Sequence, residues 1–233
     1  MKRIQLAALC FMAVLSIAGC GKDENPPSPK GPQGGDQNPG ETRVSQYVVK
    51  DSRNIYHISN LPGNATSSGG TPVFYSFTTH DIVDSAKVLT DEWDICFDNI
   101  YNSFVTANNP DKTTPPGPDG AGRGALVVVL KPFDQVTEAP SDEVFAASDS
   151  YAAWDGFPAG HVGWYNYEMD THIMRTIAGR TIVIRTAKGK YAKLEMLSLY
   201  KDNPENPTRS SPIPFITGRY WVQEDGSRNL AIP

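Results

Sequence analysis

One β-hairpin in the last quarter of the sequence constrains the fold more than any other stretch. Residues 180–186 are β-branched almost throughout, and residues 191–200 alternate small or apolar residues with charged ones. Residues 187–189 between them form a turn, in which Gly189 takes a positive φ at little cost. An isolated hairpin cannot bury its apolar face, so the rest of the chain must supply further strands.

The second strand of this hairpin has two distinct faces. Because side chains alternate along a strand, Ala192, Leu194 and Met196 share one face. Lys193 and Glu195 share the other face. We therefore expect the first face to lie in the core. Leu197 and Leu199 reverse the polarity, so we expect the far end of this strand to be covered on both sides.

Other segments have the character of strands as well. Residues 72–80 and 92–107 contain short strand-like runs. Residues 124–131 contain a continuous apolar run, which predicts a central strand buried on both faces. Residues 133–147 have only weak helical character, broken by Pro140. The pattern predicts an all-β fold, an antiparallel two-sheet, sandwich-like single domain.

The N-terminus predicts export and a lipid anchor. Residues 1–19 combine two basic residues with an apolar run at 6–17 that is too short for a comfortable transmembrane helix, as in a bacterial secretory leader. Cys20 follows small residues in a lipobox-like sequence, so we expect it to be acylated; in an ordinary signal peptide it would be incidental. Residues 20–42 are rich in proline, which predicts a disordered tether before a β domain at 43–233.

The composition limits the classes of partner. The 233 residues suffice for one well-buried domain, and the formal charge of −5 argues against nucleic acid, because phosphate binding needs a basic surface. Of three cysteines, Cys10 lies in the leader and Cys20 is the lipid site, so we expect no disulfide framework. Cys96 has no basic neighbour in sequence, which predicts a partly buried, inert thiol.

No motif points to catalysis. The spacings of zinc proteases, nucleophile elbows, phosphate-binding loops and EF-hands are absent from the sequence. Asp94 and Asp98 share a strand face, but four residues of strand separate them by about 13 Å. Paired glycosidase carboxylates lie only roughly 5–9.5 Å apart. We therefore expect a binding protein and not an enzyme.

Aromatic residues are dense between positions 151 and 167, around a flexible glycine- and proline-containing loop at 156–160. These residues are Tyr151, Trp154, Phe157, Trp164, Tyr165 and Tyr167. They could line a flat apolar cavity, or they could form the well-packed centre of a β-sandwich.

Several groups of residues carry a resemblance to a known family. They are Gly163-Trp164-Tyr165-Asn166-Tyr167, Arg219-Tyr220-Trp221 with Asp225-Gly226-Ser227-Arg228, and, more thinly, Glu92-Trp93-Asp94-Ile95-Cys96-Phe97-Asp98. Together with the hairpin they resemble HmuY-type haem-binding lipoproteins. The resemblance implies an outer-membrane, surface-exposed lipoprotein that captures haem and passes it to a TonB-dependent outer-membrane haem receptor. A shared scaffold does not fix a ligand.

The resemblance also implies axial ligands for the haem iron. One of the two ligand positions, a histidine in the family, falls on Met169, and a thioether also binds haem iron. No residue matches the second position, and His161, the only histidine or methionine between 131 and 163, is the best substitute. In their plainer interpretations Met169 is a hairpin-tip residue and His161 is a solvent-exposed loop histidine.

Four further residues accompany this pair. Tyr165 and Tyr167 alternate with Met169 onto one strand face and would form aromatic walls beside it. His172 and Met174 begin the return strand and are further ligand candidates. In the competing interpretation, the chain is a non-haem β-sandwich lipoprotein that binds a protein, a peptide or a glycan at the loop 108–123 and the aromatic patch. Its main support is that the segment that should carry the second ligand is shortened.

Overall fold

The described part of the chain is a β domain. The computed structural model describes residues 40–110 and 120–233, which belong to one compact unit. The predicted signal peptide at 1–19, the lipid site Cys20 and most of the predicted tether lie outside these residues. Within them are fourteen strands, one α-helix and three short 3-10 helices, and the strand ladders run antiparallel. The predicted all-β, two-sheet fold is confirmed.

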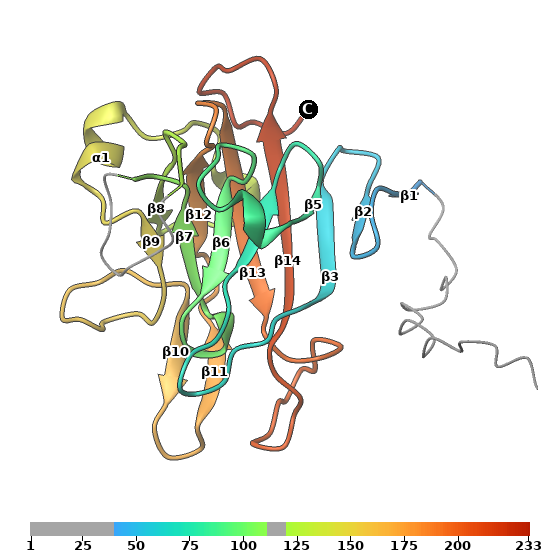
Figure 1. Ribbon diagram of the computed structural model, residues 1–233, viewed down its shortest axis with the longest axis vertical. Helices are drawn as coiled ribbons and strands as arrows, with labels where there is room; N and C mark the ends of the chain where they lie inside the picture. Colours follow the sequence, from blue (N-terminus) through green and yellow to red (C-terminus); the bar gives the residue numbers. More distant parts are fainter. Residues whose placement is uncertain (1–39, 111–119) are drawn as a thin grey trace, which may run out of the picture. The chain divides into compact units, whose positions relative to one another are not determined.

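Two sheets make up the domain, and a two-stranded ribbon extends from one end (Figure 1). In spatial order the larger sheet contains β1 (Thr42–Arg43), β2 (Val48–Lys50), β3 (Tyr56–Pro62), β14 (Phe215–Gln223), β13 (Tyr191–Ser198), β12 (Thr181–Arg185) and β8 (Ala125–Val129). The smaller sheet contains β5 (Asp81–Val83), β4 (Val73–Ser76), β6 (Ile95–Asp98), β7 (Phe104–Ala107) and β9 (Tyr151–Ala152). The ribbon consists of β10 (Tyr165–Glu168) and β11 (Ile173–Thr176).

The helices of the described residues are short. The α-helix α1 (Asp142–Ala147) and the 3-10 helix η3 (Phe133–Gln135) flank Pro140, in agreement with the weak, interrupted helical character predicted there. The 3-10 helices η1 (Ser85–Lys87) and η2 (Ile100–Asn102) lie in connections between strands. No helix in the described ranges is long and apolar enough to cross a membrane.

The main core lies between the two sheets. Tyr75 and Phe97 of the smaller sheet pack in the same buried cluster as Leu194 and Tyr220 of the larger sheet. The hydroxyls of Tyr75 and Tyr220 lie 2.9 Å apart and form a hydrogen bond between the sheets. This bond satisfies two polar groups that would otherwise be costly to bury, while a side chain such as Leu194 contributes roughly 2 kcal/mol by its burial.

The hairpin predicted from the sequence is present as β12 and β13. Its turn is closed by a hydrogen bond from the backbone N–H of Gly189 to the carbonyl oxygen of Thr186 at 3.0 Å, and Gly189 has a φ of 83°. Ala192, Leu194 and Met196 are all buried in the main core. The apolar face of this strand is therefore confirmed.

The opposite face of β13 is covered already at Lys193, ahead of the far end of the strand. Lys193 has no exposed surface, because η3, α1 and the C-terminal residues cover the outer face of the larger sheet. Its ammonium donates hydrogen bonds to the carbonyl oxygens of Phe133 and Val136, at 3.0 and 2.7 Å. The alternation of the strand separates the two faces correctly, but it does not reveal that a distant segment covers one of them.

The apolar run at 124–131 also differs from its prediction. It forms β8, which pairs with β12 and lies at the edge of the larger sheet, not at its centre. Ala125 and Leu126 are buried, whereas Leu130 is 66% exposed. Because β8 contacts β7 and β9 of the smaller sheet, the run reflects packing where the edges of the two sheets meet.

Cys96 of β6 and Asp94, which immediately precedes this strand, are both buried and hydrogen-bonded. The buried Asp94 carboxylate accepts hydrogen bonds from the backbone N–H groups of Phe77 at 2.7 Å and Ala187 at 3.0 Å, which links the hairpin turn to the smaller sheet. Cys96 is fully buried, more deeply than predicted. Burial raises the pKa of its thiol well above the ordinary value, so the reactive thiolate is disfavoured.

Candidate functional site

A cavity with aromatic walls lies at the end of the domain from which the ribbon extends. The β10–β11 ribbon and the loop 201–214 between β13 and β14 both project beyond the sheets at this end (Figure 1). The cavity measures about 560 Å³, within the roughly 300–1,000 Å³ of small-molecule sites. It is lined by Ser67, Ile100, Tyr101, Trp154, Tyr165, Tyr167, His172, Met174, Tyr200, Thr208, Arg209, Ser211 and Ile213.

The pairing of β10 with β11 brings four of the sequence candidates to this cavity. Tyr167 lies opposite Met174, and Tyr165 lies opposite Thr176. Side chains two residues apart on a strand share a face, so Tyr165, Tyr167 and Met174 line the cavity together. His172 joins them from the turn that connects the two strands.

The turn holds His172 through both its backbone and its ring. Its backbone N–H donates to the carbonyl oxygen of Glu168 at 2.8 Å, and its φ of 58° is left-handed, a conformation that histidine adopts more readily than most residues. Its ring Nδ1 lies 2.6 Å from the hydroxyl of Tyr167. The Glu168 carboxylate in turn accepts hydrogen bonds from Thr171 and Arg175. With Nδ1 engaged, Nε2 is the nitrogen that can bind a ligand.

Two of the tyrosines act as walls of the cavity. The hydroxyl of Tyr165 is hydrogen-bonded to Ser103 at 3.1 Å, and burial raises the pKa of Tyr165 to about 12. The hydroxyl of Tyr200 accepts the backbone N–H of Met174 at 2.9 Å, and burial raises the pKa of Tyr200 as well. Both phenols therefore stay neutral at physiological pH and present ring surface to the cavity.

Trp154 extends the aromatic wall. Its ring meets that of Tyr167 edge-to-face, with the centroids 5.5 Å apart. Phe157 stacks on Trp154 at 5.0 Å and is 63% exposed. The dense aromatic stretch thus serves both interpretations given above, because Trp164 is buried in the core, Trp154 and Tyr167 lie at the cavity, and Tyr165 belongs to both.

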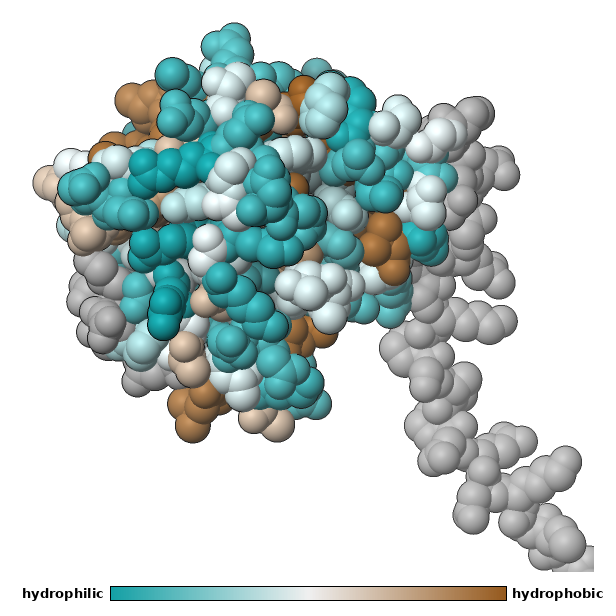
Figure 2. Space-filling model, turned by 90° about the horizontal axis from the view of Figure 1, so that it is seen from above, coloured by the Kyte–Doolittle hydropathy of each residue, from teal (hydrophilic) through white to brown (hydrophobic). Residues whose placement is uncertain are grey.

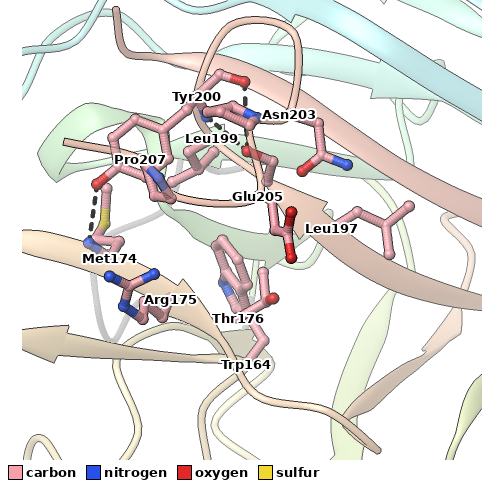
Figure 3. Close-up of a pocket in the computed structure, with 12 residues that line it drawn as sticks. Trp164, Met174, Arg175, Thr176, Leu197, Leu199, Tyr200, Asn203, Glu205 and Pro207 are labelled. Atoms are coloured by element: carbon pink, nitrogen blue, oxygen red, sulfur yellow. Dashed lines mark hydrogen bonds between the residues drawn. The ribbon is translucent and has the colours of Figure 1, made fainter. Parts of the chain in front are cut away.

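A second cavity of about 270 Å³ adjoins the first across Met174 and Tyr200, which line both. Figure 3 shows these two residues joined by the hydrogen bond from the Met174 N–H, with Arg175 and Glu205 also at the wall. Charged and amide side chains contribute more to this wall than to that of the aromatic cavity. The smaller cavity is therefore less suited to a flat apolar ligand.

The structure does not bring Met169 and His161 together. β10 ends at Glu168, so Met169 falls in the turn, where it is 63% exposed and does not line the aromatic cavity. The ring of His161 stacks on Tyr151 with centroids 4.4 Å apart and is also absent from the cavity wall. The Nε2 atom of His161 is buried without a hydrogen-bond partner in the described residues. Burial lowers the pKa of His161, so its ring is neutral near pH 7.

The donors of the aromatic cavity fit haem better than a bare metal ion. Within residues 40–110 and 120–233, no group of three or more histidine, cysteine or acidic side chains is placed to hold a metal. Haem needs only one or two axial ligands and flat apolar walls. The His172 imidazole and the Met174 thioether supply such donors beside the aromatic rings.

Among the described residues, the surface at the opposite end of the domain is less apolar. Seen from that end, the described residues are mostly hydrophilic, and their hydrophobic atoms form small separate groups (Figure 2). Scattered hydrophobic residues of this kind are normal for a protein surface. The aromatic cavity is therefore the better candidate for a ligand site.

Sequence reasoning missed part of the cavity wall. Tyr101 comes from the connection between β6 and β7, and Arg209 and Ile213 come from the loop before β14. No periodic signal marks these residues, because they lie in irregular segments. Tyr200 belongs to the hairpin sequence already singled out, and its position just beyond the end of β13 is the signal that could have identified it.

Comparisons with known proteins add little to this geometry. No family model and no curated protein matches the chain. A solved structure of a HmuY-like protein from Bacteroides vulgatus, to which haem binding is ascribed, shares 14% identity over 77% of this chain and 94% of its own, with a TM-score of 0.35. A Bacteroides fragilis protein classed as a lipoprotein shares 11% identity over 77% and 91%, also with a TM-score of 0.35. Neither similarity carries an argument about the ligand of this chain.

Proposed function

We propose that this protein is a bacterial cell-envelope lipoprotein that captures haem in the aromatic cavity, without enzymatic chemistry. The observation that carries the proposal is the His172 imidazole, held at Nδ1 by the Tyr167 hydroxyl at 2.6 Å on the wall of a 560 Å³ aromatic cavity. A histidine that binds a metal usually engages a hydrogen-bond partner with its other ring nitrogen, which sets the tautomer and the orientation of the ring.

Some side chains of the cavity would bind the iron of haem, and others would contact its ring. Haem would supply an iron atom that binds nitrogen or sulfur donors. His172 would bind it through Nε2 while Nδ1–H donates to the Tyr167 oxygen. The thioether of Met174 is the second donor on the wall, and the rings of Trp154 and Tyr165 would cover the macrocycle. This assignment moves the proposed ligands from Met169 and His161 to residues that line the cavity.

The cellular setting completes the proposal. The leader-like N-terminus and Cys20 support lipid anchoring, and the resemblance to HmuY-type lipoproteins implies the outer membrane with exposure at the cell surface. A protein of this kind would hand haem to a TonB-dependent outer-membrane receptor. Iron acquisition by a binding protein fits a chain whose sequence carries no catalytic motif.

A haemin titration of the purified protein, followed at the Soret band under oxidising and reducing conditions, tests the proposal. His172→Ala and Met174→Ala are expected to change the spectrum or weaken binding at least tenfold. Met169→Ala and His161→Ala serve as matched controls and are expected to leave both unchanged, because neither residue lines the cavity.

Two outcomes would contradict the proposal in different ways. A change in Met169→Ala or His161→Ala, with His172→Ala unaffected, would return the ligand role to the pair predicted from sequence. If micromolar haemin does not bind in either redox state, the protein is instead a non-haem interaction lipoprotein for a protein, peptide or glycan.

A further inference from the structure

The wall of the aromatic cavity contains polar groups beside its apolar surface. The ribbon and Trp154 provide aromatic and thioether surface, whereas Ser67, Thr208 and Ser211 provide hydroxyl groups, and Arg209 provides a guanidinium group. No aspartate or glutamate is among the described residues that line this cavity. The cavity therefore combines an apolar surface with a cation that no acid in its wall neutralises.

Arg209 lies in a turn that is stabilised by hydrogen bonds between other residues. The backbone N–H of Thr208 donates to the Ser211 hydroxyl oxygen at 2.9 Å, and the Ser211 N–H donates to the Thr208 carbonyl oxygen at 3.0 Å. A further bond, from the N–H of Lys201 to the carbonyl oxygen of Pro212 at 3.0 Å, closes the base of the loop. The guanidinium of Arg209 makes no ion pair or hydrogen bond within the described residues. Its five N–H donors are thus available to a ligand.

We propose that the aromatic cavity selects flat apolar ligands that carry an anionic group, and that Arg209 binds this group while the aromatic wall covers the rest. The inference rests on the proposed function only in taking this cavity as the ligand site, and it does not depend on iron. Arginine suits the task because its planar fork forms paired, charge-assisted hydrogen bonds to the oxygens of an oxyanion such as carboxylate or sulfonate. The hydroxyl-bearing residues Thr208 and Ser211 of the same loop also line the cavity.

Two fluorescent dyes separate the anionic group from the apolar frame. 8-Anilinonaphthalene-1-sulfonate and N-phenyl-1-naphthylamine share the same rings, and only the first carries a sulfonate. Arg209→Gln in the purified protein is expected to weaken binding of the sulfonate dye about tenfold and to change the affinity for the neutral dye by no more than about twofold. Arg209→Lys, which keeps the charge, is expected to restore part of the loss. Lys201→Gln removes a charge from the same loop outside the cavity wall and is expected to affect neither dye.

The outcomes distinguish this inference from the haem proposal. Equal effects of Arg209→Gln on both dyes, no effect on either, or failure of the wild-type protein to bind the sulfonate dye would overturn the inference. Competition with haemin then tests the proposed function separately. If Arg209→Gln weakens the sulfonate dye selectively but haemin does not displace the dye, anion selection stands and haem capture fails. If haemin displaces the dye but Arg209→Gln has no selective effect, haem capture stands and anion selection fails.

Discussion

Replacing the buried Lys193 should change how the stability of the domain depends on pH. Its ammonium has no exposed surface, donates to the Phe133 and Val136 carbonyl oxygens, and lies 4.8 Å from the Phe133 ring centroid. Burial lowers the pKa of Lys193 from the ordinary 10.5 to about 8 in the folded protein. The unfolded chain therefore binds more protons between these two values, so this group makes the free energy of unfolding rise with pH.

The magnitude follows from the two pKa values. As the pH rises from about 7.5 to about 9.5, Lys193 in the folded protein loses most of its proton while Lys193 in the unfolded chain stays protonated. Integrating the difference in bound protons gives a gain of about 2 kcal/mol in the free energy of unfolding over this range. Lys193→Met removes the titrating group and keeps most of the volume, so the variant should lack this gain.

Urea unfolding of both proteins at several pH values measures the effect. Buried tyrosines and Cys96 also titrate differently in the folded and unfolded states at alkaline pH, but they are common to both proteins and cancel in the difference. The difference in unfolding free energy between wild type and Lys193→Met should therefore shift by about 2 kcal/mol in favour of the wild type as the pH rises. A constant difference across the pH range would refute a buried Lys193 with a lowered pKa.

Two further perturbations test other parts of the structure. Tyr167→Phe removes the hydrogen bond to His172 Nδ1 and should weaken haemin binding about tenfold in a Soret titration. Unchanged haemin affinity in this variant, together with weakened binding in His172→Ala, would show that the hydrogen bond does not support His172 as a ligand. Asp98 is buried, and burial raises its pKa to about 7, partly offset by hydrogen bonds from Cys96 and Thr106. The neutral Asp98 carboxyl stabilises the fold fully below the unfolded pKa of about 3.8, and this stabilisation is lost as the pH rises through 7. The free energy of unfolding of the wild type should therefore fall by about 2 kcal/mol between about pH 5.5 and about pH 8. Asp98→Asn should lack this loss in urea unfolding, and an identical pH profile would contradict the raised pKa.

The sequence predicted the parts of the fold that depend on neighbouring residues. The hairpin of β12 and β13 appears where turn chemistry and alternation place it, and Met196 lies in the core as its spacing requires. The same alternation correctly puts Tyr165 and Tyr167 on one face. It extends to Met169 only if the strand continues, whereas β10 ends at Glu168. The chain turns there, and His172 lies beside Tyr167 instead.

The sequence by itself determined the β character of the domain, the position of the hairpin and the division of its strands into two faces. Only the tertiary structure decided that β8 lies at a sheet edge, that Lys193 is covered, and that Tyr101 and Arg209 reach the aromatic cavity. The physical reason is the range of the forces involved. Alternation and turn preferences act within a few residues, whereas strand order, coverage of a sheet face and the lining of a cavity depend on packing between segments far apart in the chain.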